Sequence, residues 1–385
     1  MTNYIKKILA GIAVGIANVI PGVSGGTIAV VFGVYSDLID MAAFDIEKIK
    51  NKWKDFLSLL CGAAFGILLF AKLFKILYEK FPVQINFFFI GLIMGSVFLI
   101  FELVKDFPPL KKSASVIKFF WFLLGLGIML LTFAVMMTGY LDDRSIKSWG
   151  EYLKGSLDLI LSIIMSLIIF YVYFQGSVTF WLPFTSNFVT VPPAVFFITS
   201  TLILWISINT TNCTDGVDGL SGTLILIALV SLGIVFYFIL GHVKVASYLL
   251  VPNIASGAKW AVMIFTLCGV LTGYLWHNAY PSRVLMGDAG SRSLGFFIGI
   301  LVIISGNPFI LLMTSGVILI NGGTGILKIV LLRFFKIKIF KNIRFPLHDH
   351  MKKNLQWSPT QVLLRFMILQ ILITIVVLGI LFKVR

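Results

Sequence analysis

Long runs without a charged residue constrain this chain more than any other feature. Residues 159–214 contain no Asp, Glu, Lys or Arg, and about 20 apolar residues suffice to cross the hydrocarbon core of a bilayer. This run is therefore long enough for two crossings, with a turn near 181–193 that contains three prolines. With 59% hydrophobic and 12% charged residues, the chain is predicted to be an all-α, polytopic integral membrane protein with about ten transmembrane helices.

Other apolar runs predict the remaining crossings. We expect single crossings at about 56–71, 81–101, 119–141, 220–240, 260–276 and 366–381, and two between 294 and 331 that turn at 305–308. From 139 onward, an even number of crossings separates each polar cluster from the next. The count therefore brings five polar clusters to one membrane face, around 142, 215, 278, 288 and 348.

The distribution of basic residues predicts which face this is. Loops on the face of the clusters carry Arg144, Lys147, Arg283, Arg292 and a basic segment at 333–353, whereas the turns at 176–190 and 305–308 carry no basic residue. The positive-inside rule then places the clusters on the cytoplasmic side of the membrane.

The same rule fits the first third less well. The crossing count puts the basic linkers at 48–54 and 105–118 outside, so we expect an extra crossing, a re-entrant element or a different topological origin there.

The net charge of +15 suits a protein that contacts anionic membrane lipids and phosphorylated substrates. Nucleic acid is a poor partner, because the basic residues lie in short loops between crossings. The sequence leaves a homodimer open.

Five carboxylates converge on the cytoplasmic face by this count. Gathered acids repel one another unless a cation lies among them, and oxygen ligands together with substrate phosphates suit Mg²⁺. This favours phosphoryl transfer, in which the protein positions a diphosphate and stabilises its charge. His348 and His350, in the basic segment, could bind phosphate or assist proton movement. The five carboxylates belong to Asp142, Asp143, Asp215, Asp218 and Asp288.

Plainer explanations exist for each cluster taken alone. Asp142 and Asp143 could be a solvated helix end, Asp218 could cap the next helix, and the Gly287-Asp288 pair could be an ordinary turn. Histidines in a basic loop are often simply exposed. The convergence of all clusters on one face is what favours a common site.

The segment Asn18-Val-Ile-Pro-Gly-Val-Ser-Gly-Gly-Thr27 interrupts the first apolar run. Irregular backbone at membrane depth survives only where protein or water satisfies it, which favours a re-entrant or broken helix; a loop between two short helices is the alternative. This motif resembles the bacterial polyprenyl-phosphate transporter family, and the resemblance extends over roughly the first third of the chain. That resemblance implies a lipid-phosphate pathway built from two inverted halves, of which one characteristic element is present here.

From about residue 138 onward the sequence resembles a second family, the phospho-N-acetylmuramoyl-pentapeptide transferases. The motifs that carry the resemblance are Gly139-Tyr-Leu-Asp-Asp143, Asn212-Cys-Thr-Asp-Gly-Val-Asp-Gly-Leu220, Trp276-His-Asn-Ala-Tyr280 with Met286-Gly-Asp-Ala-Gly-Ser291, and Pro346-Leu-His-Asp-His350 followed by Trp357-Ser-Pro-Thr-Gln-Val362.

This resemblance implies transfer of a phospho-sugar peptide from a UDP-linked muramoyl-pentapeptide to undecaprenyl phosphate, giving lipid I and UMP with Mg²⁺ as cofactor. It implies that Asp142 is the base toward the lipid phosphate with Asp143 beside it, and that Asp288 holds magnesium. Asn212, Asp215, Asp218 and Asn278 would line the uridine and diphosphate site, and His348 and His350 would lie near the phosphates or the sugar.

The sequence departs from the family pattern in three places. Asp349 stands where the family commonly has the middle of three histidines, and Lys147 lies one residue later than the usual lysine. The family's opening helices are not recognisable, and the transporter-like segment takes their place. We therefore predict a fusion of a transporter-like part, 1–135, with a transferase part, 136–385.

Two other functions remain open at this point. One is a polyprenyl-phosphate transporter or lipid-binding protein with an inactive transferase half. The other is a UDP-N-acetylglucosamine polyprenyl-phosphate transferase, which shares the acidic motifs.

Overall fold

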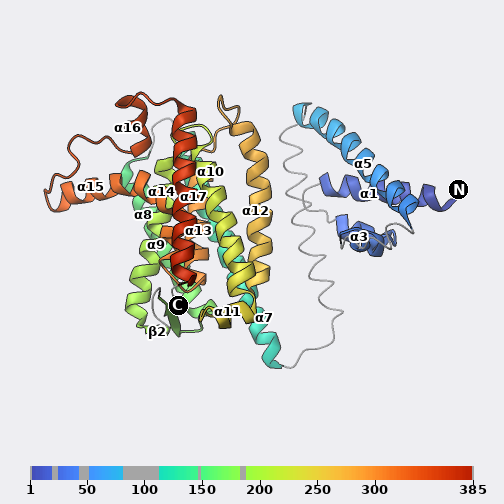
Figure 1. Ribbon diagram of the computed structural model, residues 1–385, viewed down its shortest axis with the longest axis horizontal. Coiled ribbons are helices and arrows are strands. Elements are labelled where there is room, and N and C mark those ends of the chain that lie inside the picture. The colour runs from blue at the N-terminus through green and yellow to red at the C-terminus, as the bar shows by residue number, and fades with distance from the viewer. Residues whose placement is uncertain are drawn as a thin grey trace. The chain divides into compact units, whose positions relative to one another are not determined.

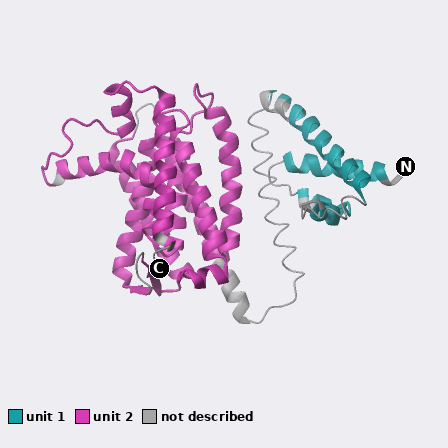
Figure 2. Cartoon of the chain, viewed as in Figure 1, with its two compact units in different colours: residues 1–110 teal, residues 111–385 magenta. Residues whose placement is uncertain are grey.

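The computed structural model describes residues 2–19, 25–42, 52–80, 112–145, 149–182 and 188–383. Helices dominate these residues, which confirms the prediction of an all-α protein. The chain divides into two compact units, Met1–Leu110 and Lys111–Arg385 (Figure 2).

Unit 1 is built on two helices that pack very closely. A Cβ on Gly11 or Gly15 would lie 2.3 or 2.2 Å from backbone oxygens of the facing helix, and Gly62 and Gly66 are equally close in return. Small residues four apart allow this approach of two backbones in a membrane protein. The described helices of unit 1 are α1 (Thr2–Val19), α2 (Gly25–Val31), α3 (Tyr35–Ala42) and α5 (Trp53–Lys80).

An ion cluster joins the same unit at one end. The Lys7 ammonium of α1 lies 2.8 Å from Asp37 of α3 and 2.9 Å from Asp55 of α5. Although burial opposes it, these two carboxylates raise the pKa of Lys7. The cluster therefore fixes three helices by one charged side chain.

The expected interruption of the first apolar run falls between α1, which is described to Val19, and α2, which is described from Gly25. Residues 20–24 lie outside the described residues, and so does the predicted crossing at 81–101. The crossing predicted at 56–71 lies within α5.

Unit 2 is a helical bundle with one small hairpin (Figure 1). Three helices contain or continue into π-helical turns, η1 (Ile169–Tyr173), η2 (Val235–Leu240) and η3 (Leu319–Gly323). The other elements are α7 (Lys112–Arg144), α8 (Glu151–Ile168), β1 (Val178–Trp181), β2 (Phe188–Val191), α9 (Pro193–Thr214), α10 (Leu220–Ile234), α11 (Val243–Tyr248), α12 (Gly257–Asn278), α13 (Gly287–Ile304), α14 (Ile310–Ile318), α15 (Thr324–Phe334), α16 (Leu347–Lys353) and α17 (Pro359–Lys383).

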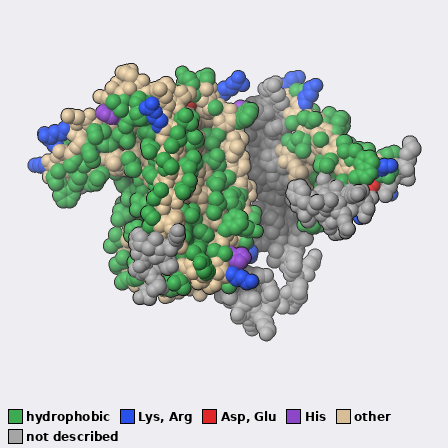
Figure 3. All heavy atoms as spheres, viewed as in Figure 1, with side chains coloured by type: hydrophobic (Ala, Val, Ile, Leu, Met, Phe, Trp, Pro, Cys, Tyr) green, Lys and Arg blue, Asp and Glu red, His purple; other side chains and the backbone are tan. Residues whose placement is uncertain are grey.

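Nine helices of the described chain are long and apolar enough to cross a membrane, and eight of them belong to unit 2. Hydrophobic side chains cover the middle of unit 2 in Figure 3, with Lys and Arg toward its ends. The expected linker at 105–118 was wrong in part, because α7 already begins at Lys112. α7 also runs through the predicted boundary between 135 and 136, and the division of roles between the two parts stays a prediction.

The core of unit 2 lies around α10 and α13. Twelve of the eighteen residues of α13 are buried, and α10 is apolar on all sides with ten buried residues. A helix that is hydrophobic all round belongs in the interior of a bundle. These two helices are therefore surrounded by the others, and α13 can position its first turn rigidly.

The turns on the far side from the polar clusters meet as the crossing count requires. The indole Nε1 of Trp181 donates to the Ser305 oxygen at 2.8 Å, and the Trp181 amide donates to Gly306 at 3.1 Å. At the turn predicted near 181–193, β1 and β2 pair antiparallel, with Val178 opposite Val191. In Figure 1, β2, α11 and the C-terminus lie at the opposite end of unit 2 from α16.

Candidate active site

Three carboxylates form a cluster where α7 ends and α13 begins. Oxygen atoms of Asp142, Asp143 and Asp288 lie within 4.8 Å of one another. Asp142 is 4% exposed, accepts a hydrogen bond from the Trp149 amide at 2.6 Å, and forms an ion pair with Lys154. Asp143 is exposed and accepts from the Asp288 amide at 2.9 Å. The Asp288 carboxylate lies 3.4 Å from the Lys154 ammonium.

Two glycines make this cluster sterically possible. A Cβ on Gly139 would lie 2.5 Å from the Asp288 carbonyl carbon, so α7 and α13 touch backbone to backbone there. Gly287 has φ +63°, and a Cβ on it would lie 2.6 Å from an Asp143 oxygen. A side chain at either position would push apart the helix ends that carry the carboxylates.

Asp215 adjoins the cluster from the end of α9. The Gly287 amide hydrogen-bonds to its carboxylate, which opposes a shift toward the neutral form. Burial and the charge of Asp288, with smaller effects of Asp143 and Asp218, nevertheless raise the pKa of Asp215 to about 6. A cation among these carboxylates would relieve the repulsion.

Asn212, Asp218 and Asn278 mainly bind neighbouring protein groups. The Asn212 oxygen accepts from the Ser291 hydroxyl at 2.9 Å, and Asp218 accepts from the Ser282 amide at 3.1 Å. The side-chain oxygen of Asn278 accepts from the backbone amide of Gly219 at 2.9 Å, and its side-chain nitrogen donates to the Val284 carbonyl at 2.7 Å. These contacts fix the loops at 215–219 and 279–286 beside the carboxylates, and a role in substrate binding stays a prediction.

His348 is buried, whereas His350 is only partly buried. The His348 Nδ1 lies 3.1 Å from the Asn321 amide nitrogen, and its backbone amide donates to the Asn321 oxygen at 2.8 Å. A Cβ on Gly216 would lie 2.2 Å from the ring, so His348 rests directly on the loop of Asp215. His350 accepts from the Arg344 amide at 3.3 Å.

The structure thus brings the predicted residues of all five clusters to one end of unit 2. Hydrogen bonds or direct contacts link the loop of Asp215 to α13, to Asn278 and to His348. Lys147 lies outside the described residues. Asp349 lies 3.7 Å from Arg344 and 3.4 Å from Lys353.

Two residues at this end did not emerge from the sequence. Lys154 lies between Asp142 and Asp288, although it is in the first turns of α8 rather than in a polar motif. Asn321, in the π-helical turn η3, links His348 to Thr214. Asn321 lies inside a long apolar run, where an isolated polar residue is itself a signal of function, whereas Lys154 lies among other charged residues and carries no such signal.

Arg292 corrects the sequence analysis. It was expected in a loop on the cytoplasmic face, but it lies within α13, is 1% exposed and pairs with Asp158 of α8 at 2.5 Å. Its charge therefore does not count toward the orientation argument, which rests on the remaining basic residues.

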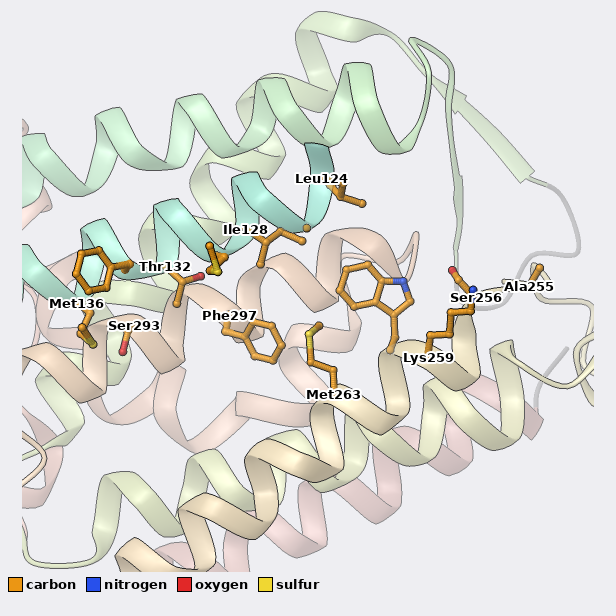
Figure 4. Close-up of a pocket in the computed structure, with 14 residues that line it drawn as sticks. Leu124, Ile128, Thr132, Met136, Ala255, Ser256, Lys259, Met263, Ser293 and Phe297 are labelled. Carbon is orange, nitrogen blue, oxygen red and sulfur yellow. The ribbon is translucent and has the colours of Figure 1, made fainter. Parts of the chain in front are cut away.

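An apolar groove of about 840 Å³ lies between α7 and α12 and extends to α13 (Figure 4). Ile128, Met136, Met263 and Phe297 are among its lining side chains, and Lys259 lies at one end. Met136 and Ser293 lie six and five residues from Asp142 and Asp288 along their helices. The close contact of α7 with α13 at Gly139 comes between the groove and these carboxylates.

The donor set of the cluster fits a hard divalent cation. All three ligand groups are carboxylates, and one of them, Asp143, is exposed to solvent, so that water and substrate oxygens could complete the coordination. No thiol or imidazole belongs to this group, which favours magnesium over zinc.

Comparison with known proteins gives consistent results. Residues 125–306 match the model of glycosyl transferase family 4. A phospho-N-acetylmuramoyl-pentapeptide-transferase of Treponema pallidum is 62% identical over 258 residues, which cover 67% of this chain and 71% of that protein. The protein of the same name from Sulfurimonas denitrificans is 32% identical over 292 residues, covering 74% and 78%, and that from Campylobacter hominis is 36% identical over 177 residues, covering 46% and 49%.

Proposed function

Because this chain belongs to the family of phospho-N-acetylmuramoyl-pentapeptide transferases, we propose that it transfers phospho-N-acetylmuramoyl-pentapeptide from its UDP-linked precursor to undecaprenyl phosphate. The products are lipid I and UMP, and the reaction serves peptidoglycan synthesis. The observation that carries the proposal is the cluster of Asp142, Asp143 and Asp288 at one end of the membrane-spanning bundle.

In the proposed reaction, an oxygen of undecaprenyl phosphate bonds to the phosphorus that bears the sugar. The bond between this phosphorus and the bridging oxygen of the UDP group breaks, and UMP leaves with that oxygen. Asp142 takes the proton of the acceptor phosphate and is held in place by the Trp149 amide and Lys154. Lys154 also supplies positive charge next to the reacting phosphates.

Magnesium fits the carboxylates and would neutralise charge on the diphosphate when bound. Asp288 is its main proposed ligand, and the Asp143 carboxylate is hydrogen-bonded to the Asp288 amide so that the two stay close. Asn212, Asp215, Asp218 and Asn278 line the adjoining uridine and diphosphate site in this proposal. His350 and the basic segment face the phosphates or the sugar, and His348 supports the loop of Asp215 from behind.

The proposed location is the bacterial plasma membrane, with this end in the cytoplasm, where the nucleotide-linked substrate is present. The basic residues near the cluster, including Lys352 and Arg344, support this orientation.

The test is transfer by the full chain, purified in detergent, from UDP-N-acetylmuramoyl-pentapeptide to undecaprenyl phosphate. We expect lipid I and UMP with magnesium and none with EDTA. Asp142→Asn and Asp288→Ala should each lower kcat at least about 100-fold, because the first removes the proposed base and the second removes the main proposed magnesium ligand. Glu151→Gln is the control, since Glu151 is an exposed acid at the same end, whose one ion pair among the described residues is with Arg333 at 3.2 Å.

Unchanged activity in Asp142→Asn and Asp288→Ala would refute the assigned roles. A competition between UDP-N-acetylglucosamine and the muramoyl substrate decides between the two sugar specificities. Absence of transfer, together with flux of polyprenyl phosphate across liposomes, would support the transporter function instead.

A further inference from the structure

A second charged contact lies below the carboxylate cluster. Arg292 Nη2 of α13 is 2.5 Å from Asp158 Oδ1 of α8, and both side chains are only 1% exposed. Both residues lie within candidate membrane spans. The Asn209 side chain of α9 also hydrogen-bonds to Asp158. Three helices therefore meet at a charge pair that the proposed reaction does not use.

The Asp158–Arg292 pair repeats the Lys154–Asp288 contact one helical turn further along the same two helices. We call the Lys154–Asp288 contact the upper level and the Asp158–Arg292 pair the lower level. On α8, Lys154 and Asp158 are four residues apart, and on α13, Asp288 and Arg292 are four residues apart. Residues with this spacing lie on one face of a helix, one turn apart. Lys154 meets Asp288 at the upper level, and Asp158 meets Arg292 at the lower level.

The alternation of charge permits one register of α8 against α13. Sliding α13 by one turn in one direction would place Arg292 opposite Lys154, and sliding it in the other direction would place Asp288 opposite Asp158. Either slip sets like charges against each other in a weakly polar interior, where repulsion is strong. Apolar side chains at 158 and 292 would impose no such restriction.

Stability alone does not account for the pair. Desolvating two charges costs about as much as their attraction returns, and apolar replacements of similar volume often fold as well or better. The best documented use of a buried charged contact is to fix register. Arg292 Nη1 has no hydrogen-bond partner among the described residues, so the pair is not fully compensated either.

We infer that Arg292 and Asp158 are positioning residues, which hold α13 against α8 in the register that brings Asp288 to Lys154. This inference rests on the proposed transferase function for its kinetic consequence. Neither residue contacts substrate, and both act through the upper level of the pattern. A slip of one turn between α8 and α13 would separate Asp288 from Lys154 by about 5 Å.

The test replaces both members together, because removing one would leave a buried unpaired charge. We expect Asp158→Leu/Arg292→Leu in the full chain to keep the wild-type melting temperature within a few degrees. Its kcat should fall at least about tenfold, with KM for both substrates within about threefold. Affinity of the cluster for Mn²⁺, measured by electron paramagnetic resonance without substrate, should fall at least about threefold. Arg292→Lys, which keeps the charge, should keep most of the kcat.

The control is Ser166→Ala/Thr201→Val, which removes a polar contact of 3.2 Å between α8 and α9 deeper in the bundle. It should leave kcat and Mn²⁺ affinity unchanged. If the leucine double variant does not fold, Asp158→Asn/Arg292→Gln, which keeps hydrogen bonding without charge, takes its place.

Wild-type kcat and Mn²⁺ affinity in a folded double variant would overturn the inference, and so would an Arg292→Lys protein as impaired as the double variant. If the wild-type chain shows no transfer at all, the proposed function fails. Mn²⁺ affinity then still decides the positioning role, because it requires the register and not the reaction.

Discussion

At the scale of single residues, burial raises the pKa of Asp215 and lowers the pKa of His348. Both changes favour the neutral form of the side chain. The pKa of Asp215 rises to about 6, through burial and the charge of Asp288. The pKa of His348 falls to about 4, through burial and the charges of Lys352 and Lys353, against the opposing charge of Asp349. At neutral pH the His348 ring is therefore uncharged. It hydrogen-bonds to Asn321 on one side and packs against Gly216 on the other.

This predicts a pH dependence of stability that is specific to His348. Its pKa is about 6.5 in an unfolded chain, so between pH 6.5 and 4 the unfolded state binds the proton more strongly than the folded state. The contribution of His348 to stability is therefore complete above pH 6.5 and falls as the pH drops toward 4, by at most about 3 kcal/mol.

Melting temperatures of the wild type and His348→Asn between pH 7.5 and 4.5 test this prediction. The wild type should lose more stability on acidification than His348→Asn, in which this position does not titrate. His350→Asn, on the same helix but less buried, should follow the wild type. Parallel curves for the wild type and His348→Asn would contradict the prediction.

At the scale of elements, α13 is positioned by close contacts with three neighbours. Gly139 of α7 touches its first turn, and a Cβ on Gly295 would lie 2.4 Å from the Ser207 oxygen of α9. The ion pair of Arg292 joins it to α8. A helix held this closely can present Asp288 in one fixed position, and such rigidity is what charge stabilisation in a reaction needs.

Gly139→Ala is expected to disrupt the cluster more than the fold. The added Cβ has backbone atoms of Asp288 and Ala289 at 2.5 to 2.6 Å, so α7 and α13 must separate and the three carboxylates move apart. We expect kcat to fall at least about tenfold and the free energy of unfolding to fall by about 1–3 kcal/mol.

Gly125→Ala is the matched control, because a Cβ at Gly125 of the same helix meets no atom within 4 Å. It should keep full activity and stabilise α7 slightly, by up to about 1 kcal/mol, since alanine favours a helix more than glycine. Equal activity of the two variants would show that the Gly139 contact does not set the cluster.

At the scale of the whole molecule, the polytopic helical bundle gathers its chemistry at one end. The predicted clusters lie between the ends of α7, α9 and α12 and the starts of α8, α13 and α16, and β1, β2 and the turn at 305–309 lie at the other end. The role of unit 1 in function stays a prediction. Within unit 1, α1 and α5 pack closely against each other.

Labelling in bacterial cells tests the orientation. The three native cysteines, Cys61, Cys213 and Cys268, are first replaced. A new cysteine at Asn342, in the exposed basic segment, should react with a membrane-impermeant maleimide only in inverted vesicles. A cysteine at His242, at the opposite end, should react in intact spheroplasts. Labelling of Asn342→Cys from outside would place the cluster on the wrong side for a nucleotide substrate.

The sequence alone determined the helical class, most crossings of unit 2 and the convergence of its acidic motifs. These features can be predicted from sequence because the bilayer dictates the length of each crossing and the placement of its charges, one segment at a time.

Only the tertiary structure decided which groups touch. Lys154 joins Asp142 to Asp288, Arg292 turned out to be buried against Asp158, and Gly139 proved to be the contact that lets two helices meet. Such contacts depend on the rotation and register of helices far apart in the chain, and the hydrophobic pattern of α10 or α9, apolar on nearly every side, leaves both undetermined. Packing of side chains and the pairing of a few buried charges fix them instead.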